Sequence, residues 1–204
     1  DAASESISLF FDGDAEEKLD NLKAVTYNLE NGKVIETKLD NASVFKDKLS
    51  KNRTVRKFTF PAVKEGSIIE LSYTIKSDFL TNLQPWSFQG DLPRIWSEYE
   101  VQMPSFFNYV YLSQGYHPFH AVEKKSAFRT FNVLVPGQTA SERNESYNFS
   151  GDVQITKWIM KNVPPLKEES FTSAISNHIA KVEFQLSAHR EPLMPKDIMG
   201  NWQT

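Results

Sequence analysis

The sequence has no cysteine among its 204 residues. Disulfide frameworks, zinc–thiolate sites and cysteine nucleophiles are therefore excluded within this chain. A catalytic arrangement of Cys, His and Asp is excluded with them, because the thiolate is its nucleophile. No other nucleophile–base pair stands out in the spacing of the residues, so we predict that the chain is not an enzyme.

Long apolar runs and a strong charge of one sign are also missing. No apolar run approaches the length of about 20 residues that spans a bilayer, so we expect no transmembrane segment. The net charge of −3 gives no reason to expect nucleic acid as a partner. The sequence begins with Asp1 and shows no signal peptide, which we interpret as a processed or trimmed chain.

The stretch 56–77 carries the clearest structural pattern. Apolar and polar side chains alternate over residues 69–75, which is typical of a half-buried strand. Phe58 and Phe60 alternate with polar residues in a second strand, which Pro61 ends. We predict that the two strands form a hairpin that turns at Gly66, a residue that can take a positive φ. The apolar face of this hairpin needs a second sheet, which favours a sandwich.

Other segments of the sequence also carry signals for strands and hairpins. Asn31-Gly32 is the strongest hairpin signal, and Glu30 and Lys33 can pair across its turn. In the last strand Ala180, Val182, Phe184 and Leu186 are predicted to face inward. The other predicted strands cover residues 7–11, 23–29, 33–39, 96–103, 107–112, 127–135, 153–163 and 179–187.

Together these signals predict an all-β fold, an antiparallel β-sandwich with one or two short helices. The helical segments are expected at residues 16–22 and 39–49, and residues 137–148 are expected to form an exposed loop. Residues 1–187 are predicted to form one sandwich domain. Residues 188–204 are expected to be a linker and the start of a following segment.

Several short segments resemble a known family. They are, in order, residues 27–33 (YNLENGK), 60–67 (FPAVKEGS), 83–89 (LQPWSFQ), 96–99 (WSEY) with Met103-Pro104, and 162–164 (NVP). Over about residues 22–186 the chain resembles the domain-of-unknown-function family that lies N-terminal to transglutaminase-like domains in exported proteins of Bacteroidota. The resemblance implies an immunoglobulin-like sandwich and an exported, periplasmic or cell-envelope protein. Trp202 resembles the start of the segment that leads toward the transglutaminase-like domain.

Two hypotheses for the function follow. The first is a non-catalytic β-sandwich module that scaffolds or positions a transglutaminase-like domain, or another partner in the cell envelope. The second is a carbohydrate- or peptide-binding module that uses exposed aromatic residues, namely Trp86, Trp96 and the tyrosines near Tyr109. Trp86, Phe88 and Trp96 would then form a stacking platform, although alternating aromatic residues in a sandwich are more often core.

Neither candidate metal site is complete in the sequence. His117 and His120 lie three residues apart in a proline-containing loop, and zinc needs a third and a fourth ligand. Asp12, Asp14 and Glu16 alternate as in a calcium loop but lack its glycine and closing glutamate. We therefore predict no metal and no cofactor.

The long connection before the last predicted strand is a candidate docking surface. Residues 164–177 are long for a connection between strands, and such loops are usually functional. We predict that this loop and the linker 188–195 contact a partner, with Phe171 as an apolar contact. The alternative is that Phe171 caps the core.

Overall fold

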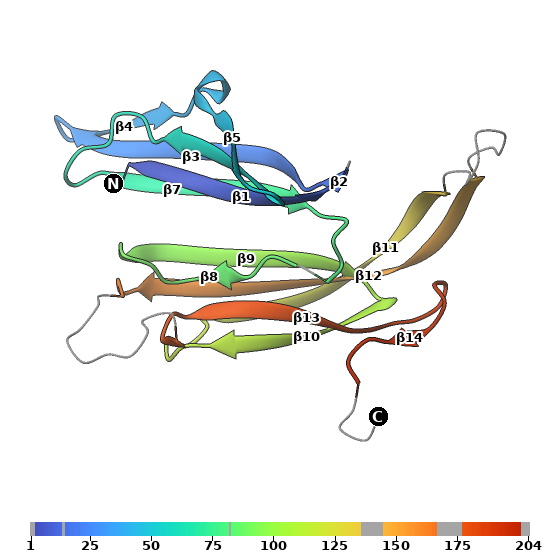
Figure 1. Ribbon diagram of the computed structural model, residues 1–204. Helices are drawn as coiled ribbons and strands as arrows, with labels where there is room; N and C mark the ends of the chain where they lie inside the picture. Colours follow the sequence, from blue (N-terminus) through green and yellow to red (C-terminus); the bar gives the residue numbers. More distant parts are fainter. Residues whose placement is uncertain (1–2, 14, 82, 136–144, 167–176, 201–204) are drawn as a thin grey trace. The chain divides into compact units, whose positions relative to one another are not determined.

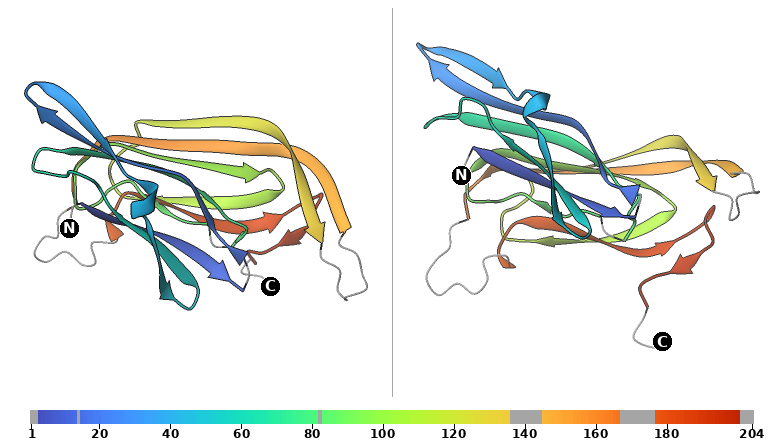
Figure 2. Two further views of the ribbon diagram at one scale, coloured as in Figure 1. Left: turned by 90° about the horizontal axis from the view of Figure 1, so that it is seen from above. Right: turned by 45° about the horizontal axis from the view of Figure 1, so that its top comes forward.

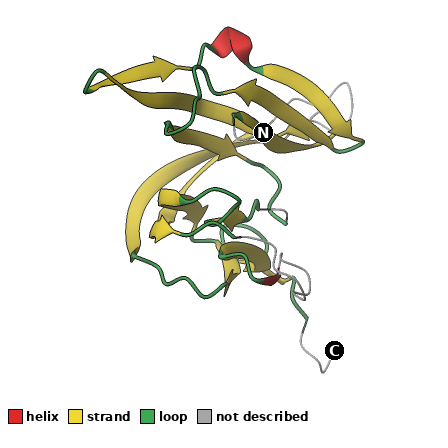
Figure 3. Cartoon of the chain, turned by 90° about the vertical axis from the view of Figure 1, so that its left-hand side faces the viewer, coloured by secondary structure: helices red, strands yellow, loops and turns green. Residues whose placement is uncertain are grey.

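The computed structural model describes residues 3–13, 15–81, 83–135, 145–166 and 177–200. Fourteen strands lie in this described part, and every strand pairing is antiparallel, so the predicted all-β fold is confirmed (Figures 1 and 3). The chain divides into two compact units, Asp1–Leu80 and Thr81–Thr204. The sequence prediction treated residues 1–187 as one domain and placed no boundary at Leu80.

The first unit consists of two sheets. One has the order β2-β1-β6-β5 and the other the order β4-β3-β7. Their bounds are β1 (Ser4–Asp12), β2 (Ala15–Glu16), β3 (Lys18–Glu30), β4 (Lys33–Lys38), β5 (Phe45–Ser50), β6 (Arg53–Thr59) and β7 (Ile68–Lys76).

One apolar core joins these two sheets. Ile7 and Leu9 of β1 and Phe58 of β6 are buried in it. The alternating apolar side chains of β7, from Ile69 to Ile75, pack against the same cluster and are half-buried, as predicted. The predicted need of these strands for a second sheet is thereby met inside the first unit.

The predicted hairpin at Gly66 is wrong in its pairing. Its two strands exist, but β6 pairs with β1 and β5, whereas β7 pairs with β3. The connection therefore carries the chain from one sheet to the other, with Gly66 at a φ of +84°. Alternation fixes which face of each strand is buried but does not determine the strand's neighbour, so closeness in the sequence predicted the wrong partner.

Both predicted helices of the first unit are wrong. Residues 18–22 belong to β3, and its pairing with β7 contains a bulge between Asp20 and Lys23. The bulge, with Asn21 at a φ of +54°, turns both Leu19 and Leu22 toward the core. An extra residue in a strand thus produced the three-residue apolar spacing that resembles a helix.

Residues 39–49 contain only one turn of 3₁₀ helix, η1 (Asn41–Ser43) (Figure 3). The Asp40 side chain caps this turn by accepting a hydrogen bond from the backbone N–H of Ala42. The segment then enters the edge strand β5, where Phe45 and Leu49 are exposed. Their four-residue spacing is the same as on one face of a helix, which explains the wrong prediction.

The Asn31-Gly32 hairpin is confirmed, with Glu30 opposite Lys33. Both turn residues take a positive φ, of +50° and +76°. The predicted ion pair across the turn is replaced by another, because the Glu30 carboxylate lies 2.6 Å from Lys64 Nζ.

The second unit also consists of two sheets. One has the order β10-β13-β14, with β8 on β13 as well, and the other has the order β11-β12-β9. Their bounds are β8 (Trp86–Ser87), β9 (Arg94–Pro104), β10 (Phe107–Gln114), β11 (Ala121–Val135), β12 (Glu145–Val163), β13 (Lys181–His189) and β14 (Lys196–Asp197).

An aromatic core joins the two sheets of the second unit. Trp158 and Phe88 are its largest fully buried side chains. Trp158 contacts Tyr99, Tyr111 and Phe184 edge-on or stacked, at centroid distances of 5.6–6.3 Å. The predicted inward face of the last strand is confirmed for Ala180, Val182 and Leu186, which are buried, and for Phe184, which packs against this core.

The strands β11 and β12 form a long hairpin that continues past the end of β9 (Figure 2). β9 pairs with β12 only from Val153 onward, so residues 145–152 pair with β11 alone. Phe131 and Phe149 stack on this part of the hairpin, and both meet the buried Phe106 edge-on. The predicted loop 137–148 is wrong from residue 145 on, and residues 136–144 lie outside the described part.

The predicted linker 188–204 contains regular structure. β13 continues to His189, and β14 returns along it. The backbone N–H groups of Ile198 and Met199 both donate to the Ser187 carbonyl, at 2.8 and 3.1 Å.

The immunoglobulin-like connectivity stays a prediction. Among the described residues, no helix has the length and apolar character needed to cross a bilayer.

Candidate functional site

The predicted aromatic platform is not brought together. Trp86 is half-buried, stacks on Tyr99 at 5.6 Å and donates to Ser97 Oγ at 3.2 Å, so it belongs to the inner side of β9. Phe88 is fully buried. Trp96 precedes Ser97 in β9 and points to the opposite side, where half of its surface is exposed. The two tryptophans therefore share no stacking surface.

Trp96 lies at one end of a polar row on the outer face of β9. Its indole N–H donates to Glu98 at 3.2 Å, and its ring meets His120 edge-on at 6.1 Å. Lys157 of β12 binds Glu98 at 2.8 Å and Glu100 at 3.5 Å. The hydrogen bond to Glu98 raises the pKa of the Lys157 ammonium group, which therefore remains charged and paired.

Of the other two predicted contact residues, Tyr109 lies in the described part of the chain and Phe171 does not. Tyr109 is half-buried on β10, and burial raises the pKa of its phenol to about 12. Its hydroxyl is therefore a neutral hydrogen-bonding group and not a base near neutral pH. Phe171 and residues 167–176 of the predicted docking loop lie outside the described residues.

The histidines of the loop that follows Gly115 have other contacts. His117 Nε2 lies 3.2 Å from the Lys161 carbonyl oxygen, and His120 lies against Trp96. Across the described residues, no group of three or more His, Asp or Glu side chains is arranged to hold a metal ion.

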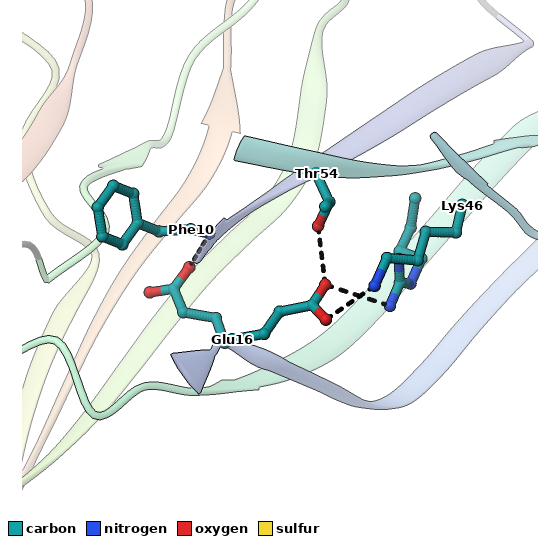
Figure 4. Close-up of polar contacts among 6 residues, drawn as sticks. Phe10, Glu16, Lys46 and Thr54 are labelled. Carbon is teal, nitrogen blue, oxygen red and sulfur yellow. Dashed lines mark hydrogen bonds and ion pairs between the residues drawn. The ribbon is translucent and has the colours of Figure 1, made fainter. Parts of the chain in front are cut away.

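Glu16, which the sequence placed in a possible calcium loop, is bound to cationic and hydroxyl groups (Figure 4). Its carboxylate accepts from Lys46 Nζ at 2.7 Å and from Thr54 Oγ1 at 2.9 Å, and Arg56 lies 3.8 Å away. The hydrogen bond from Lys46 lowers the pKa of this carboxyl group, with smaller contributions from Thr54 and Arg56. Asp14 lies outside the described residues.

The next residue, Glu17, is 1% exposed, and its carboxylate accepts from the Phe10 backbone N–H at 2.8 Å (Figure 4). Glu17 lines a cleft of about 470 Å³ together with Glu16, Lys18, Leu19, Asp20 and Arg56. These contacts tie β2 and the start of β3 to β1, β5 and β6. The charges of Glu16, Lys46 and Arg56 are therefore used in contacts between strands of the first unit.

An incompletely paired edge of β13 is a feature that sequence reasoning missed. Two short strands pair with the same edge: β8 meets Lys181 and Val182, and β14 meets Ala188 and His189. Between Val182 and Ala188 no described strand pairs with that edge, but Leu83 and Pro85, which precede β8, lie beside Glu183 and Gln185 there. β10 pairs along the opposite edge.

A depression of about 260 Å³ lies beside this unpaired interval of β13. Its lining combines apolar side chains from three segments with the polar groups of β13, and the residues are Leu83, Pro85, Leu112, Glu183, Phe184 and Gln185. The sequence carries one signal for it. Val110 and Leu112 are apolar at two positions where alternation should have placed polar residues on the outer face.

Comparison with known proteins gives one match. The model of a family described as a domain of unknown function with a solved structure (DUF3857) matches residues 2–167. No curated protein matches the chain, and no solved structure matches it either.

Proposed function

This chain belongs to the DUF3857 family, and we propose that it is a non-catalytic β-sandwich module that positions a protein partner. The partner is a transglutaminase-like domain or another protein of the cell envelope. An exported, periplasmic location and an immunoglobulin-like connectivity are part of the same proposal, and both derive from the sequence segments that resemble the family.

One observation carries the proposal. β10 is the outer strand of its sheet, and Val110 and Leu112 on its outer face are 42% and 57% exposed, whereas the ring of Tyr111 between them meets Trp158 on the inner face. Proteins usually protect the edge strands of sheets with charges, proline or short length, because an exposed apolar edge associates with other chains. Two solvent-facing apolar side chains on the outer face of an outer strand are therefore well suited to a protein interface.

The test uses a transglutaminase-like domain added as a separate chain, with association measured by sedimentation and calorimetry. Val110→Lys replaces one of these two apolar side chains with a charge and should weaken association by about tenfold or more. The matched control is Val122→Lys on β11, since Val122 is 46% exposed on the outer strand of the other sheet. Both substitutions are at exposed positions and should change stability by about 0.5 kcal/mol or less.

Two outcomes contradict this proposal. One is the absence of any association between the two chains at concentrations where weak domain interfaces form. The other is an equal loss of association in both lysine variants, because that result would report a change in net charge and not a surface on β10.

The exposure of Trp96 favours a second candidate function. Half of this indole is open to solvent, and Glu98 and His120 lie beside it as polar groups. An oligosaccharide could stack on the ring and bind these groups. On a glycan array, Trp96→Ala should abolish any binding, whereas Phe128→Ala, at another exposed aromatic residue on β11, should not. Binding that survives Trp96→Ala rules out this site.

A further inference from the structure

We propose that the outer face of the sheet β4-β3-β7 binds a second copy of this chain and forms a symmetric dimer. The inference concerns the first unit and goes beyond the proposed function, whose surface lies on β10 of the second unit. It rests on the apolar and charged side chains that this sheet directs away from the core of the first unit.

Burial distinguishes the two faces of this sheet, in which β4, β3 and β7 lie side by side (Figure 1). Thr26 and Asn28 of β3 are buried and lie on the inner face. Successive side chains of a strand point to opposite faces, so Tyr27 and Leu29 lie on the outer face. The Tyr27 hydroxyl donates to the Glu70 carboxylate at 2.7 Å, which places this residue of β7 on the outer face as well.

Three exposed apolar side chains gather at one end of the outer face. Leu29 of β3 lies opposite Val34 of β4, and their side chains are 72% and 66% exposed. Ile68 of β7 lies opposite Tyr27 in the next row and is 52% exposed. Opposite and diagonal positions of a sheet lie about 5–8 Å apart, so the three side chains form one patch. Exposed apolar patches of this kind mark interaction surfaces.

Charged groups of opposite sign lie on the two outer strands of the same face. Val25 of β3 is opposite Lys38 of β4 on one side and opposite Glu70 of β7 on the other, so the three form one row. Lys38 and Glu70 are both exposed. Within the described part of the chain, neither of them forms an ion pair. Both charges are therefore available to a molecule that covers this face.

This arrangement is self-complementary, which favours a second copy as the occupant. A two-fold axis parallel to β3 places β7 of one copy over β4 of the other. Lys38 of each copy then faces Glu70 of its partner, and the interface contains this ion pair twice. Symmetric dimers require one surface that complements itself in this way.

The other charges of the outer face also argue for a second copy. Glu36, opposite Tyr27, and Lys23, opposite Ser72, add one charge of each sign. A face with charges of a single sign would favour a partner of the opposite sign, and this face does not have such an excess.

The apolar patch lies close to the proposed two-fold axis. Since β3 is the middle strand of the sheet, Leu29 of one copy meets Leu29 of the other. Facing sheets cross at about 30°, so the two copies diverge along the strands, and Lys23 lies beyond Val25 at the solvated rim. Because the contact is confined to three strands, we expect a Kd of about 10–100 μM.

The first test measures self-association of the whole chain by sedimentation equilibrium at about 1 μM to 1 mM chain. Leu29→Lys places a charge in the patch and should weaken the dimer by about tenfold or more. Phe45→Lys is the matched control, since Phe45 is a 66% exposed apolar residue on β5, at the edge of the other sheet of the first unit. The control should dimerise like the unchanged chain.

The second test exchanges the charges of the proposed ion pair. Lys38→Glu and Glu70→Lys should each weaken self-association by about tenfold, because like charges then face each other twice. An equimolar mixture of the two variants should restore dimerisation, since each ion pair between unlike copies again has opposite charges. Lys124→Glu, at an exposed position of β11, is the control with the same change in net charge and should dimerise normally.

The third test uses the absence of cysteine from the chain, which gives thiol cross-linking no background. In a Leu29→Cys variant, the two introduced thiols lie close to the two-fold axis. A short bis-maleimide should therefore join two copies at concentrations where the dimer forms. The Phe45→Cys variant should stay monomeric in a denaturing gel under the same conditions.

The inference is overturned if the chain sediments as a monomer at about 1 mM, or if Leu29→Lys and Phe45→Lys weaken the dimer equally. Failure of the mixed charge variants to restore dimerisation also overturns it. Val110→Lys should dimerise normally, and a loss of the dimer in this variant would assign self-association to β10 instead. Failure of the transglutaminase-like domain to associate contradicts the proposed function and leaves the dimer unaffected.

Discussion

The two units use different means to pass the chain from one sheet to the facing one. In the first unit the connection from β6 to β7 turns at Gly66, and a Cβ added there would meet nothing within 4 Å. In the second unit the connection from β10 to β11 starts at Gly115, where an added Cβ would lie 2.5 Å from Ala180 Cα. Gly66 therefore has free space around it, whereas Gly115 lies in close contact with Ala180, the residue that precedes β13.

In the first unit the connection from β6 to β7 is held by hydrogen bonds and not by close packing around its glycine. The buried Asn28 side chain donates to the Ala62 carbonyl at 2.9 Å and accepts from Ser67 Oγ at 2.6 Å. These bonds hold the connection at both of its ends. A connection between two facing sheets can thus be held by hydrogen bonds or by close steric contact. The two kinds of connection should respond differently to substitution.

The largest expected effect concerns the aromatic core of the second unit. Trp158 is 2% exposed, and replacing it with alanine removes its contacts with three aromatic rings. Trp158→Ala should lower the free energy of unfolding by about 3–5 kcal/mol, measured from amide exchange in β12 and β13. Trp96→Ala, at the half-exposed tryptophan of the same unit, should cost less than about 1 kcal/mol. Similar losses in both variants would contradict the burial assigned to Trp158.

The next largest effect tests the close steric contact between Gly115 and Ala180. Gly115→Ala combines an unfavourable φ of +97° with a clash against the Ala180 backbone and should cost about 2–4 kcal/mol. Gly66→Ala carries only the strain of its φ of +84° and should cost about 1 kcal/mol. Urea unfolding of both variants measures the difference. Equal losses would show that Ala180 does not constrain the crossing.

A smaller effect tests the hydrogen bonds of Asn28 to the connection from β6 to β7. Asn28→Ala leaves the Ala62 carbonyl and the Ser67 hydroxyl without this partner and should cost about 1–3 kcal/mol. Asn132→Ala is the control, because its bonds to Ser146 and Asn148 lie on an exposed surface, and it should cost about 0.5 kcal/mol or less. Faster amide exchange near Gly66 in the Asn28 variant alone would sharpen the comparison, and unchanged exchange would contradict it.

Local features of this fold could be predicted from the sequence. Alternation located β7 and the inward face of β13, and Asn31-Gly32 located a hairpin, because each signal depends on a few neighbouring residues. The pairing of β6 and β7 with different sheets could not be predicted in the same way. It depends on contacts with β1 and β3, which lie far away in the sequence.

The candidate site has the same limit. Trp86 and Trp96 are candidates for one stacking platform in the sequence, yet the half-buried Trp86 packs toward the inner side of β9 and Trp96 lies on its outer side. One edge of β13 is unpaired in its middle because β8 and β14 pair with its two ends only. No pattern within β13 itself indicates that its middle would lack a paired strand on one side.

The smallest effect is a pH dependence of stability that arises from the polar cluster around Glu16. The hydrogen bond from Lys46 holds the pKa of the Glu16 carboxyl below its usual value of 4.5, and Thr54 adds to this. A carboxyl group with a lowered pKa in the folded state stabilises the protein above its unfolded pKa, and this stability is lost as the pH falls through the folded pKa. Acidification from about pH 6 to pH 3 should therefore destabilise the native chain more than a Glu16→Gln variant.

Urea unfolding at the two pH values measures this difference. Lys46→Met removes the main cause of the lowered pKa, so it should reduce the acid-dependent loss in the same way as Glu16→Gln. The double variant should then reduce it no further, because both substitutions break one interaction. An unchanged acid-dependent loss in Glu16→Gln would mean that the carboxylate contributes no stability through this pair, and the cluster would hold β2 through the Glu17 contact to Phe10 instead.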